Sequence, residues 1–195
     1  MTSTESLQKR FAAAFMPNYG VPPLAISRGQ GCRVRDADGR EYLDLIAGIA
    51  VSSLGHAHPA IVEAVSRQVA EVAHTSNLYL HEREIDLAER ILALLGTDGR
   101  VFLANSGAEA NEAAIKLVRR IAGPARPVLV AAERSFHGRT MGSLALTGKE
   151  SIRAPFGPFG LTVRFVPYGD AGALRTAVGP DVAAVFLEPG LGESG

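Results

Sequence analysis

The chain has 195 residues, 47% of them hydrophobic, and its 20 Lys and Arg residues balance its 20 Asp and Glu residues. A chain of this length can bury a sizeable core, no stretch approaches the roughly 18 apolar residues of a membrane span, and the balanced charge gives no general attraction to nucleic acid or to a membrane surface. Cys32 is the single cysteine, which excludes an intramolecular disulfide and fits a reducing, cytoplasmic compartment.

The N-terminal part predicts a short helix, a loop and a hairpin. Residues 1–15 favour the helix, and the loop follows at 17–23, where three prolines and a glycine disfavour helix. Tyr19 lies in this loop, where an aromatic ring ordinarily packs. Asp38-Gly39 lies between the strand-like runs 32–35 and 41–45, a strong hairpin signal.

The next segment, IAGIAVSSLGHAH at 46–58, is apolar and small and predicts a buried loop or irregular strand. His56 and His58 could form a metal pair, but two ligands without a nearby third favour a turn leading into a helix. That helix begins at Pro59, and a second one covers 82–95. Each shows an apolar line expected to face the core: Val62, Val65, Val69 and Val72 in the first, and Ile85, Ala88, Leu92 and Leu95 in the second.

The segment 100–121 predicts a strand that feeds a helix. Val101–Ala104 is a short apolar run typical of a strand buried on both faces. Ser106 with Glu109 forms a capping-box pattern, so we expect Ser106 to cap the helix. The expected core stripe of that helix consists of Ala110, Ala114, Leu117 and Ile121.

The turn at Ser106-Gly107-Ala108 should leave backbone N–H groups free at the carboxyl edge of a sheet, which suits a phosphate. An ordinary capped helix explains the same residues about as well. The segment is neither a Walker loop nor a dinucleotide fingerprint, because both glycine patterns are absent.

Further strands are predicted at 127–132, 161–166 and 182–187, with helices from Met141 and over 171–178. The segment 135–140, SFHGRT, then lies at a strand's carboxyl end, where open α/β sheets bind ligands. Alternating strands and helices predict an α/β fold with a doubly wound, mostly parallel sheet.

The last nine residues, LEPGLGESG, place Glu188 and Glu193 after the final strand. Two carboxylates at a sheet edge could act as general acid and base. Alternatively, Glu188 satisfies nearby backbone donors and Glu193 is solvated.

Two of these segments carry a resemblance to a known family. NSGAEANEAAIK at 105–116 and SFHGRTMGSLALTG at 135–148 resemble, in order and spacing, the cofactor segments of class III (ornithine-type) aminotransferases, which use pyridoxal phosphate. The resemblance covers nearly the whole chain and is closest to acetylornithine aminotransferases of bacterial arginine biosynthesis. It implies a fold type I transferase, with residues 56–195 as part of the large cofactor-binding domain and residues 1–55 as part of a small N-terminal α+β domain.

The resemblance also implies roles for individual residues. The cofactor would be bound by Ser106, Gly107, Ala108, Phe136 and Glu188. The substrate would be bound by Tyr19, Ile49, Arg139 and Glu193. Ile49 stands where ornithine enzymes typically carry Tyr, which turns the predicted specificity away from free ornithine, and Leu191 stands where the family usually has Gln.

In the family, the lysine that forms the Schiff base and the aspartate that pairs with the pyridine nitrogen lie downstream, beyond Gly195. The lysines of this chain, Lys9, Lys116 and Lys149, match no family lysine position. We therefore expect no catalytic residue in this chain, and read it as the N-terminal half of an enzyme, inactive alone.

The predicted reaction transfers the amino group of N-acetylornithine to 2-oxoglutarate. Alternatives within the family are 4-aminobutyrate, succinylornithine and ornithine aminotransferases, and the family implies a cytoplasmic homodimer. A rival of another class is a truncated, non-catalytic module that binds a phosphate ligand or a sister subunit. A metal hydrolase using His56, His58 and Glu63 is a further but less favoured alternative, so no metal is expected.

Overall fold

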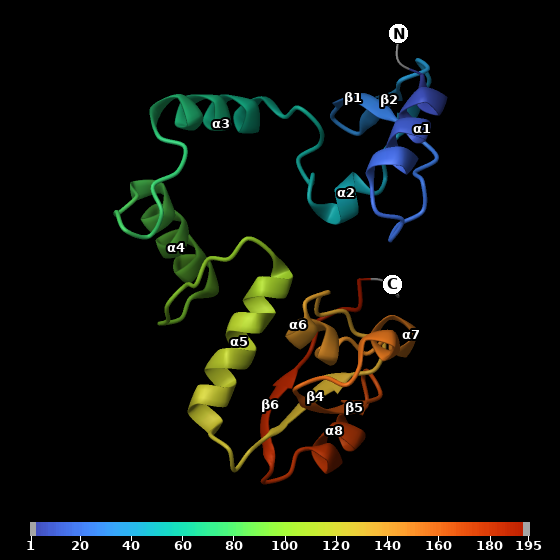
Figure 1. The fold of residues 1–195 in the computed structure, drawn as a ribbon. Helices are drawn as coiled ribbons and strands as arrows, with labels where there is room; N and C mark the ends of the chain where they lie inside the picture. The colour runs from blue at the N-terminus through green and yellow to red at the C-terminus, as the bar shows by residue number, and fades with distance from the viewer. Residues whose placement is uncertain (1–2, 193–195) are drawn as a thin grey trace. The chain divides into compact units, whose positions relative to one another are not determined.

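A computed structural model describes residues 3–192, and the chain separates into two compact units, Met1–Glu82 and Arg83–Gly195 (Figure 1). The domain boundary predicted at residues 55–56 stays a prediction. The two units are defined by contacts within these 195 residues, and such contacts do not test a domain of a longer protein. None of the described helices is both long enough and apolar enough to cross a membrane.

The first unit contains a helix and a small antiparallel sheet. Helix α1, Thr4–Ala14, begins at Ser3, whose side chain accepts a hydrogen bond from the Ser6 amide. The sheet has the order β1-β2-β3 and consists of β1 (Ile26–Gln30), β2 (Arg33–Asp36) and β3 (Glu41–Leu43). The predicted hairpin is β2 and β3, so it is confirmed. Strand β1 was not predicted, because ISRGQ has neither apolar alternation nor a continuous apolar run.

Two further elements complete this unit. Residues Ala47–Ala50 form the short turn α2, and α3, Pro59–Glu71, begins with its proline in the first turn, as predicted. The valine line of α3 is exposed rather than packed on a core; Val65, for example, is 60% exposed. That prediction is wrong for the described chain, because an apolar helix face is buried only where another element covers it.

The second unit is built on the parallel sheet β5-β4-β6. Its strands are β4 (Val128–Ala132), β5 (Thr162–Val166) and β6 (Val182–Phe186). The connection from β4 to β5 contains α6 (Met141–Leu146), α7 (Glu150–Arg153) and the 3-10 turn η1 (Ala154–Phe156), and α8 (Ala171–Ala177) joins β5 to β6. Strand β4 lies in the centre and all five of its residues are buried.

Helices cover both faces of this sheet (Figure 1). On one face Val128 and Val130 of β4 pack with Ala177 of α8. On the other, Leu129 packs with Ile115 of helix α5 (Gly107–Ala122) and with Leu146 of α6. Consecutive strand residues thus face opposite helical layers, which explains the continuous apolar run and confirms the doubly wound class.

Three predictions about this unit are wrong. Val101–Ala104 forms no strand, and Phe102 is 73% exposed, because no described strand pairs with the segment. Helix α5 packs through Ile115, whereas Leu117 and Ile121 of the predicted stripe are exposed; the helix is apolar on more than one side, and the sheet selects the side. Helix α4, Glu82–Leu95, exists as predicted, but its Ile85 and Leu95 are likewise exposed.

Candidate functional site

Helix α5 begins with a pair of open backbone donors. Ser106 caps the helix, as predicted, and its Oγ accepts a hydrogen bond from the Glu109 amide at 3.2 Å. The Glu109 carboxylate turns back to the Asn105 amide, at 2.7 Å. Within the described chain the amides of Gly107 and Ala108 donate to no protein group, and a Cβ added at Gly107 would meet nothing within 4 Å. Two free N–H groups at the positive end of a 16-residue helix suit an anion.

The loop after β4 packs directly against this helix start. Gly138, with φ 134°, approaches so closely that an added Cβ would lie 2.8 Å from Cβ of Ala108. Asn111 of α5 donates from Nδ2 to the carbonyl oxygen of His137 at 2.7 Å. The structure therefore brings the predicted phosphate turn and the SFHGRT segment together.

Glu188 joins the same edge from the end of β6. Its Oε2 accepts a hydrogen bond from the backbone N–H of Phe136 at 3.0 Å, and the hydroxyl of Tyr168 donates to the Glu188 carbonyl oxygen at 3.2 Å. The Arg139 guanidinium lies over the Phe136 ring, 5.6 Å from its centroid. Phe136, Arg139 and Glu188, predicted from two separate segments, thus form one cluster.

Glu112 is a structural centre of this edge that the sequence interpretation missed. Its Oε1 accepts hydrogen bonds from the Thr140 hydroxyl at 2.6 Å, the Gly142 amide at 2.8 Å and the Ser143 amide at 3.1 Å. The Thr140 hydroxyl foremost, together with these amides, holds the pKa of the Glu112 carboxyl below its ordinary value. Glu112 therefore fixes the start of α6, a role that became visible only once α5 and α6 were adjacent.

His137 was not singled out from the sequence either. It is 7% exposed, its amide donates to Thr147 Oγ1 at 3.1 Å, and its ring packs edge-on against Phe186. Within the described residues its Nε2 is buried without a hydrogen-bond partner. Burial lowers the pKa of His137, and the charge of Glu188 opposes that shift in part. A neutral ring is therefore favoured here.

The predicted substrate residues of the first unit are exposed. Tyr19 lies in the loop after α1, and Ile49 is 87% exposed on the turn Ala47–Ala50. All four residues of this turn have positive φ, from 49° to 62°. Left-handed backbone costs about 1–2 kcal/mol for each residue with a Cβ, so strong local contacts must hold the turn.

The contacts that hold the turn come from Asp44 and His56. Asp44 Oδ1 accepts hydrogen bonds from the amides of Ile46 and Ala47, each at 2.9 Å, and Oδ2 pairs with His56 Nε2 at 2.7 Å. The His56 ring, followed by the two amides, holds the pKa of the Asp44 carboxyl below its ordinary value. His56 thus binds a carboxylate in the turn before α3, and within residues 3–192 no group of three candidate ligands could hold a metal.

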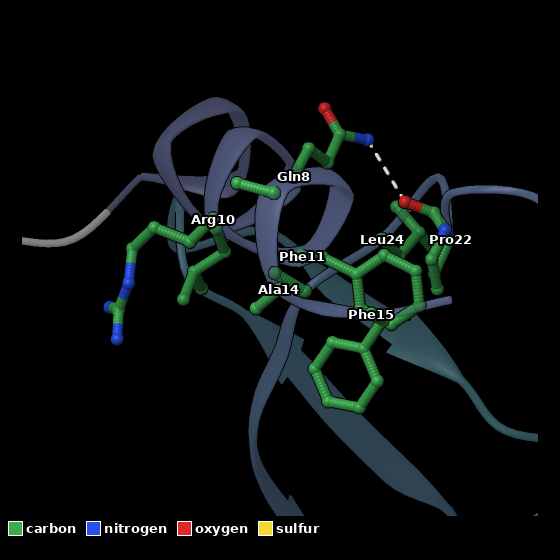
Figure 2. A pocket seen from close by; sticks show the side chains of 10 residues that line it. Gln8, Arg10, Phe11, Ala14, Phe15, Pro22 and Leu24 are labelled. Carbon is green, nitrogen blue, oxygen red and sulfur yellow. Dashed lines mark hydrogen bonds between the residues drawn. The ribbon is translucent and has the colours of Figure 1, made fainter. Parts of the chain in front are cut away.

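A separate apolar hollow of about 580 Å³ lies between α1 and the loop that follows it (Figure 2). Phe11 and Phe15 stack there with their ring centroids 4.6 Å apart, and the Gln8 amide donates to the Pro22 carbonyl oxygen at 2.9 Å. Among the described residues that line the hollow, Arg10 alone is titratable, so these residues offer apolar contact rather than chemistry.

The final turn is described only to residue 192. Leu191, which stands at the position of the family's usual Gln, is buried. Glu193 lies outside the described residues, so its predicted role stays a prediction.

Comparison with known proteins gives consistent matches along the chain. The family model "Aminotransferase class-III" matches residues 14–195. The acetylornithine aminotransferase of Mycolicibacterium smegmatis is 57% identical over 190 residues, which are 97% of this chain and 48% of that protein. The chain therefore spans about half the length of the curated relatives it matches.

Solved structures agree with the sequence matches. The ornithine aminotransferase of Toxoplasma gondii superposes with a TM-score of 0.91 and 32% identity, over 99% of this chain and 47% of that one. A second structure of that enzyme is described with partial occupancy of pyridoxal phosphate (PLP) at the active site. The N-acetylornithine aminotransferase of Stenotrophomonas maltophilia has a TM-score of 0.74 and 37% identity, over 95% of this chain and 46% of that chain.

Proposed function

Because this chain belongs to the class-III aminotransferase family, we propose that it forms the phosphate-binding half of an enzyme that moves the amino group of N-acetylornithine to 2-oxoglutarate. The observation that carries the proposal is the sheet edge, where two open helix amides, Phe136, Arg139 and Glu188 come together. The amino donor is suggested by the relative at 57% identity, which is named an acetylornithine aminotransferase. Such an enzyme would serve arginine biosynthesis in the cytoplasm.

The residues of this edge fit pyridoxal phosphate. The unpartnered amides of Gly107 and Ala108 would bind its phosphate, with Ser106 fixing the helix start. Phe136 is partly exposed and would lie against the pyridine ring. When bound, this cofactor supplies the electron sink that allows an amino group to pass between an amino acid and a 2-oxo acid.

The protein's own contribution is to hold the cofactor residues in place. Glu188 fixes the backbone at Phe136, while Asn111 and Glu112 tie the following loop and α6 to α5. These bonds would orient the groups that contact the cofactor.

The family resemblance also implies substrate roles for four residues. Arg139 would bind the substrate α-carboxylate through two parallel N–H···O bonds. Ile49 would provide an aliphatic wall and Tyr19 an aromatic contact, while Glu193 would act as a gate between the two substrates. A homodimer, with active sites at the subunit interface, belongs to the same proposal.

The chain itself offers no suitable catalytic lysine. Lys9 pairs with Glu5, and Lys116 lies on α5 nine residues after Gly107, roughly 13 Å along the axis at 1.5 Å per residue. Lys149 is the N-cap of α7. We therefore assign the cofactor-anchoring lysine, which would also carry the transferred proton, to the half of its relatives that this chain does not span.

The test begins with the intact mass of the native protein, followed by turnover with purified material. We expect a chain of about twice this length, which would allow a second domain-sized piece, and glutamate production from N-acetylornithine and 2-oxoglutarate. 4-Aminobutyrate, N-succinylornithine and ornithine serve as competing donors. If acetylornithine reacts no faster than 4-aminobutyrate, the named donor is wrong while the family assignment stands.

The second candidate is a non-catalytic module, favoured by the absence of a suitable lysine among the three in the chain. This candidate predicts that the intact mass of the native protein equals that of residues 1–195. It also predicts binding of pyridoxal phosphate or inorganic phosphate without turnover. A reducible lysine adduct with the cofactor would eliminate this candidate.

A further inference from the structure

The first unit contains a strained turn whose purpose is not explained by its own packing. Residues Ala47–Ala50 all have positive φ, and three of the four carry a Cβ. Backbone of this kind persists only where its surroundings determine it, and such places concentrate at functional sites. The turn presents Ile49, which no described part of the unit covers.

Asp44 is the residue that determines this turn. Its Oδ1 accepts hydrogen bonds from the Ile46 and Ala47 amides, each at 2.9 Å. These two residues lie where the backbone φ changes from negative to positive. Its own amide donates to the Cys32 carbonyl oxygen at 2.8 Å, which ties the base of the turn to the sheet. The carboxylate is only 16% exposed, so these bonds are partly shielded from water.

His56 connects Asp44 to the sheet a second time. Its backbone N–H and carbonyl group both pair with Gly31 at 2.9 Å, immediately after β1. The ring is seated against Gly29, where an added Cβ would lie 2.6 Å from His56 Cγ. From there Nε2 reaches Asp44 Oδ2 at 2.7 Å. The sheet, the imidazole, the carboxylate and the left-handed turn thus form one continuous chain of contacts.

We propose that Asp44 and His56 are positioning residues that hold the left-handed turn, and Ile49 on it, in the geometry that selects the amino donor. Neither residue touches the substrate; both act through the backbone of residues 46–50. The inference rests on the proposed function in one respect, the contact between Ile49 and the donor. An aliphatic side chain fixed on a strained turn favours an acylated, uncharged donor end over a free ammonium group, which would be desolvated against it.

The experiment uses the complete enzyme and compares kcat and KM for N-acetylornithine and ornithine. In Asp44→Ala we expect KM for acetylornithine to rise on the order of tenfold, with a smaller change in kcat, and the preference for acetylornithine over ornithine to fall. Asp44→Asn should restore most of the preference, because an amide oxygen can still accept both backbone hydrogen bonds.

Asp36→Ala is the matched control. Asp36 is a buried carboxylate of the same unit, 3% exposed, and it accepts hydrogen bonds from two amides and the Tyr42 hydroxyl in the β2–β3 hairpin. It should lower the melting temperature without changing the donor ratio. If Asp44→Ala fails to fold, His56→Ala, which leaves the two backbone bonds of Asp44 intact, should shift the ratio in the same direction.

Two results would overturn the proposal: a donor ratio unchanged in every folded Asp44 and His56 variant, or an equal change in Asp36→Ala. Failure of the proposed function is detected separately, since it appears as absent acetylornithine turnover in the wild-type enzyme before any variant is made.

Discussion

The sheet edge of the second unit and the left-handed turn of the first both carry candidate site residues, but they are held in different ways. At the sheet edge, the bonds Asn111–His137, Glu112–Thr140 and Phe136–Glu188 join residues 26, 28 and 52 positions apart. At the turn, Asp44 reaches partners 2, 3 and 12 positions away. The edge therefore exists only when the βαβ layers are assembled, whereas the turn is held mostly by contacts between residues close in sequence. Substitutions at the edge should affect folding and cofactor binding together, and substitutions at the turn should mainly affect selectivity.

The largest effect is expected at Arg139, on the edge. Arg139→Ala in the complete enzyme should lower kcat/KM by a factor corresponding to about 2–4 kcal/mol, because a charged anchor for the substrate carboxylate is lost. Steady-state kinetics with both substrates measures this loss. Arg175→Ala, an exposed arginine on α8, is the control and should leave kcat/KM unchanged. An unaffected Arg139→Ala enzyme would remove this residue from the site.

Glu112 tests whether the edge is also a folding element. Glu112→Ala should reduce the free energy of unfolding by about 2–3 kcal/mol, since three donors lose a charged acceptor. Urea denaturation of the complete protein measures the change, and Glu112→Gln should lose less, because the amide oxygen still accepts. Cofactor affinity should fall in parallel with stability, as expected for an edge that folds as a unit.

The same carboxylate predicts a pH dependence. Its pKa is lowered on folding, so its contribution is complete above the ordinary glutamate pKa of about 4.3 and is lost as pH falls through the lowered value. The stability difference between wild type and Glu112→Gln should therefore shrink in acid below about pH 4. A constant difference down to the acid limit would mean that the carboxylate's charge contributes nothing.

The sequence predicted much of the fold because the deciding signals were local. The β2–β3 hairpin follows from Asp38-Gly39, the start of α5 from Ser106, and β4 from an apolar run with faces on two helical layers. The run Val101–Ala104 is also continuously apolar but forms no strand, since pairing depends on a neighbouring strand that no described residue provides. The motif resemblance implied site roles for Phe136, Arg139 and Glu188; the structure shows that they lie together, and their roles stay predictions.

The residues that were missed depend on contacts between distant segments. From the sequence, Glu112 is an ordinary helical carboxylate, and its role follows only from its hydrogen bonds to the start of α6. From the sequence, Asp44 belongs to a predicted strand and His56 to a possible metal-binding pair with His58, so their mutual contact was not expected. The segment IAGIA likewise gives no sign of four consecutive residues with positive φ. A pattern of residue types does not specify which side of α5 meets the sheet either, which is why Leu117 and Ile121 were assigned to the wrong side.

A smaller effect is expected at Phe136, whose proposed role is ring contact alone. Phe136→Ala should weaken pyridoxal phosphate binding by about 1 kcal/mol, or roughly fivefold in dissociation constant. Absorbance titration of the apo form of the complete enzyme measures it. Phe136→Leu should retain part of the affinity through apolar contact, and its backbone bond to Glu188 is unchanged. Equal affinity in wild type and Phe136→Ala would place the ring away from the cofactor.

The smallest effect concerns a single protonation equilibrium, and it isolates the electrostatics of the edge from its geometry. Burial lowers the pKa of His137, and the negative charge of Glu188 opposes that shift. Glu188→Gln removes the charge while keeping an oxygen to accept the Phe136 amide, so the pKa of His137 should fall further. The histidine ring signals in an NMR titration measure this change, with Glu150→Gln on α7 as a matched neutralisation elsewhere in the unit.

The sign of the accompanying stability change follows from linkage. A histidine whose pKa is lowered on folding binds its proton more readily in the unfolded chain, so stability is lost as pH falls below the ordinary histidine value of about 6.5. Glu188→Gln should steepen this acid loss and leave stability above that pH nearly unchanged. If the variant instead loses stability equally at all pH values, then the Glu188 side chain acts through the geometry of its bond to Phe136, and the charge of this edge has no influence on His137.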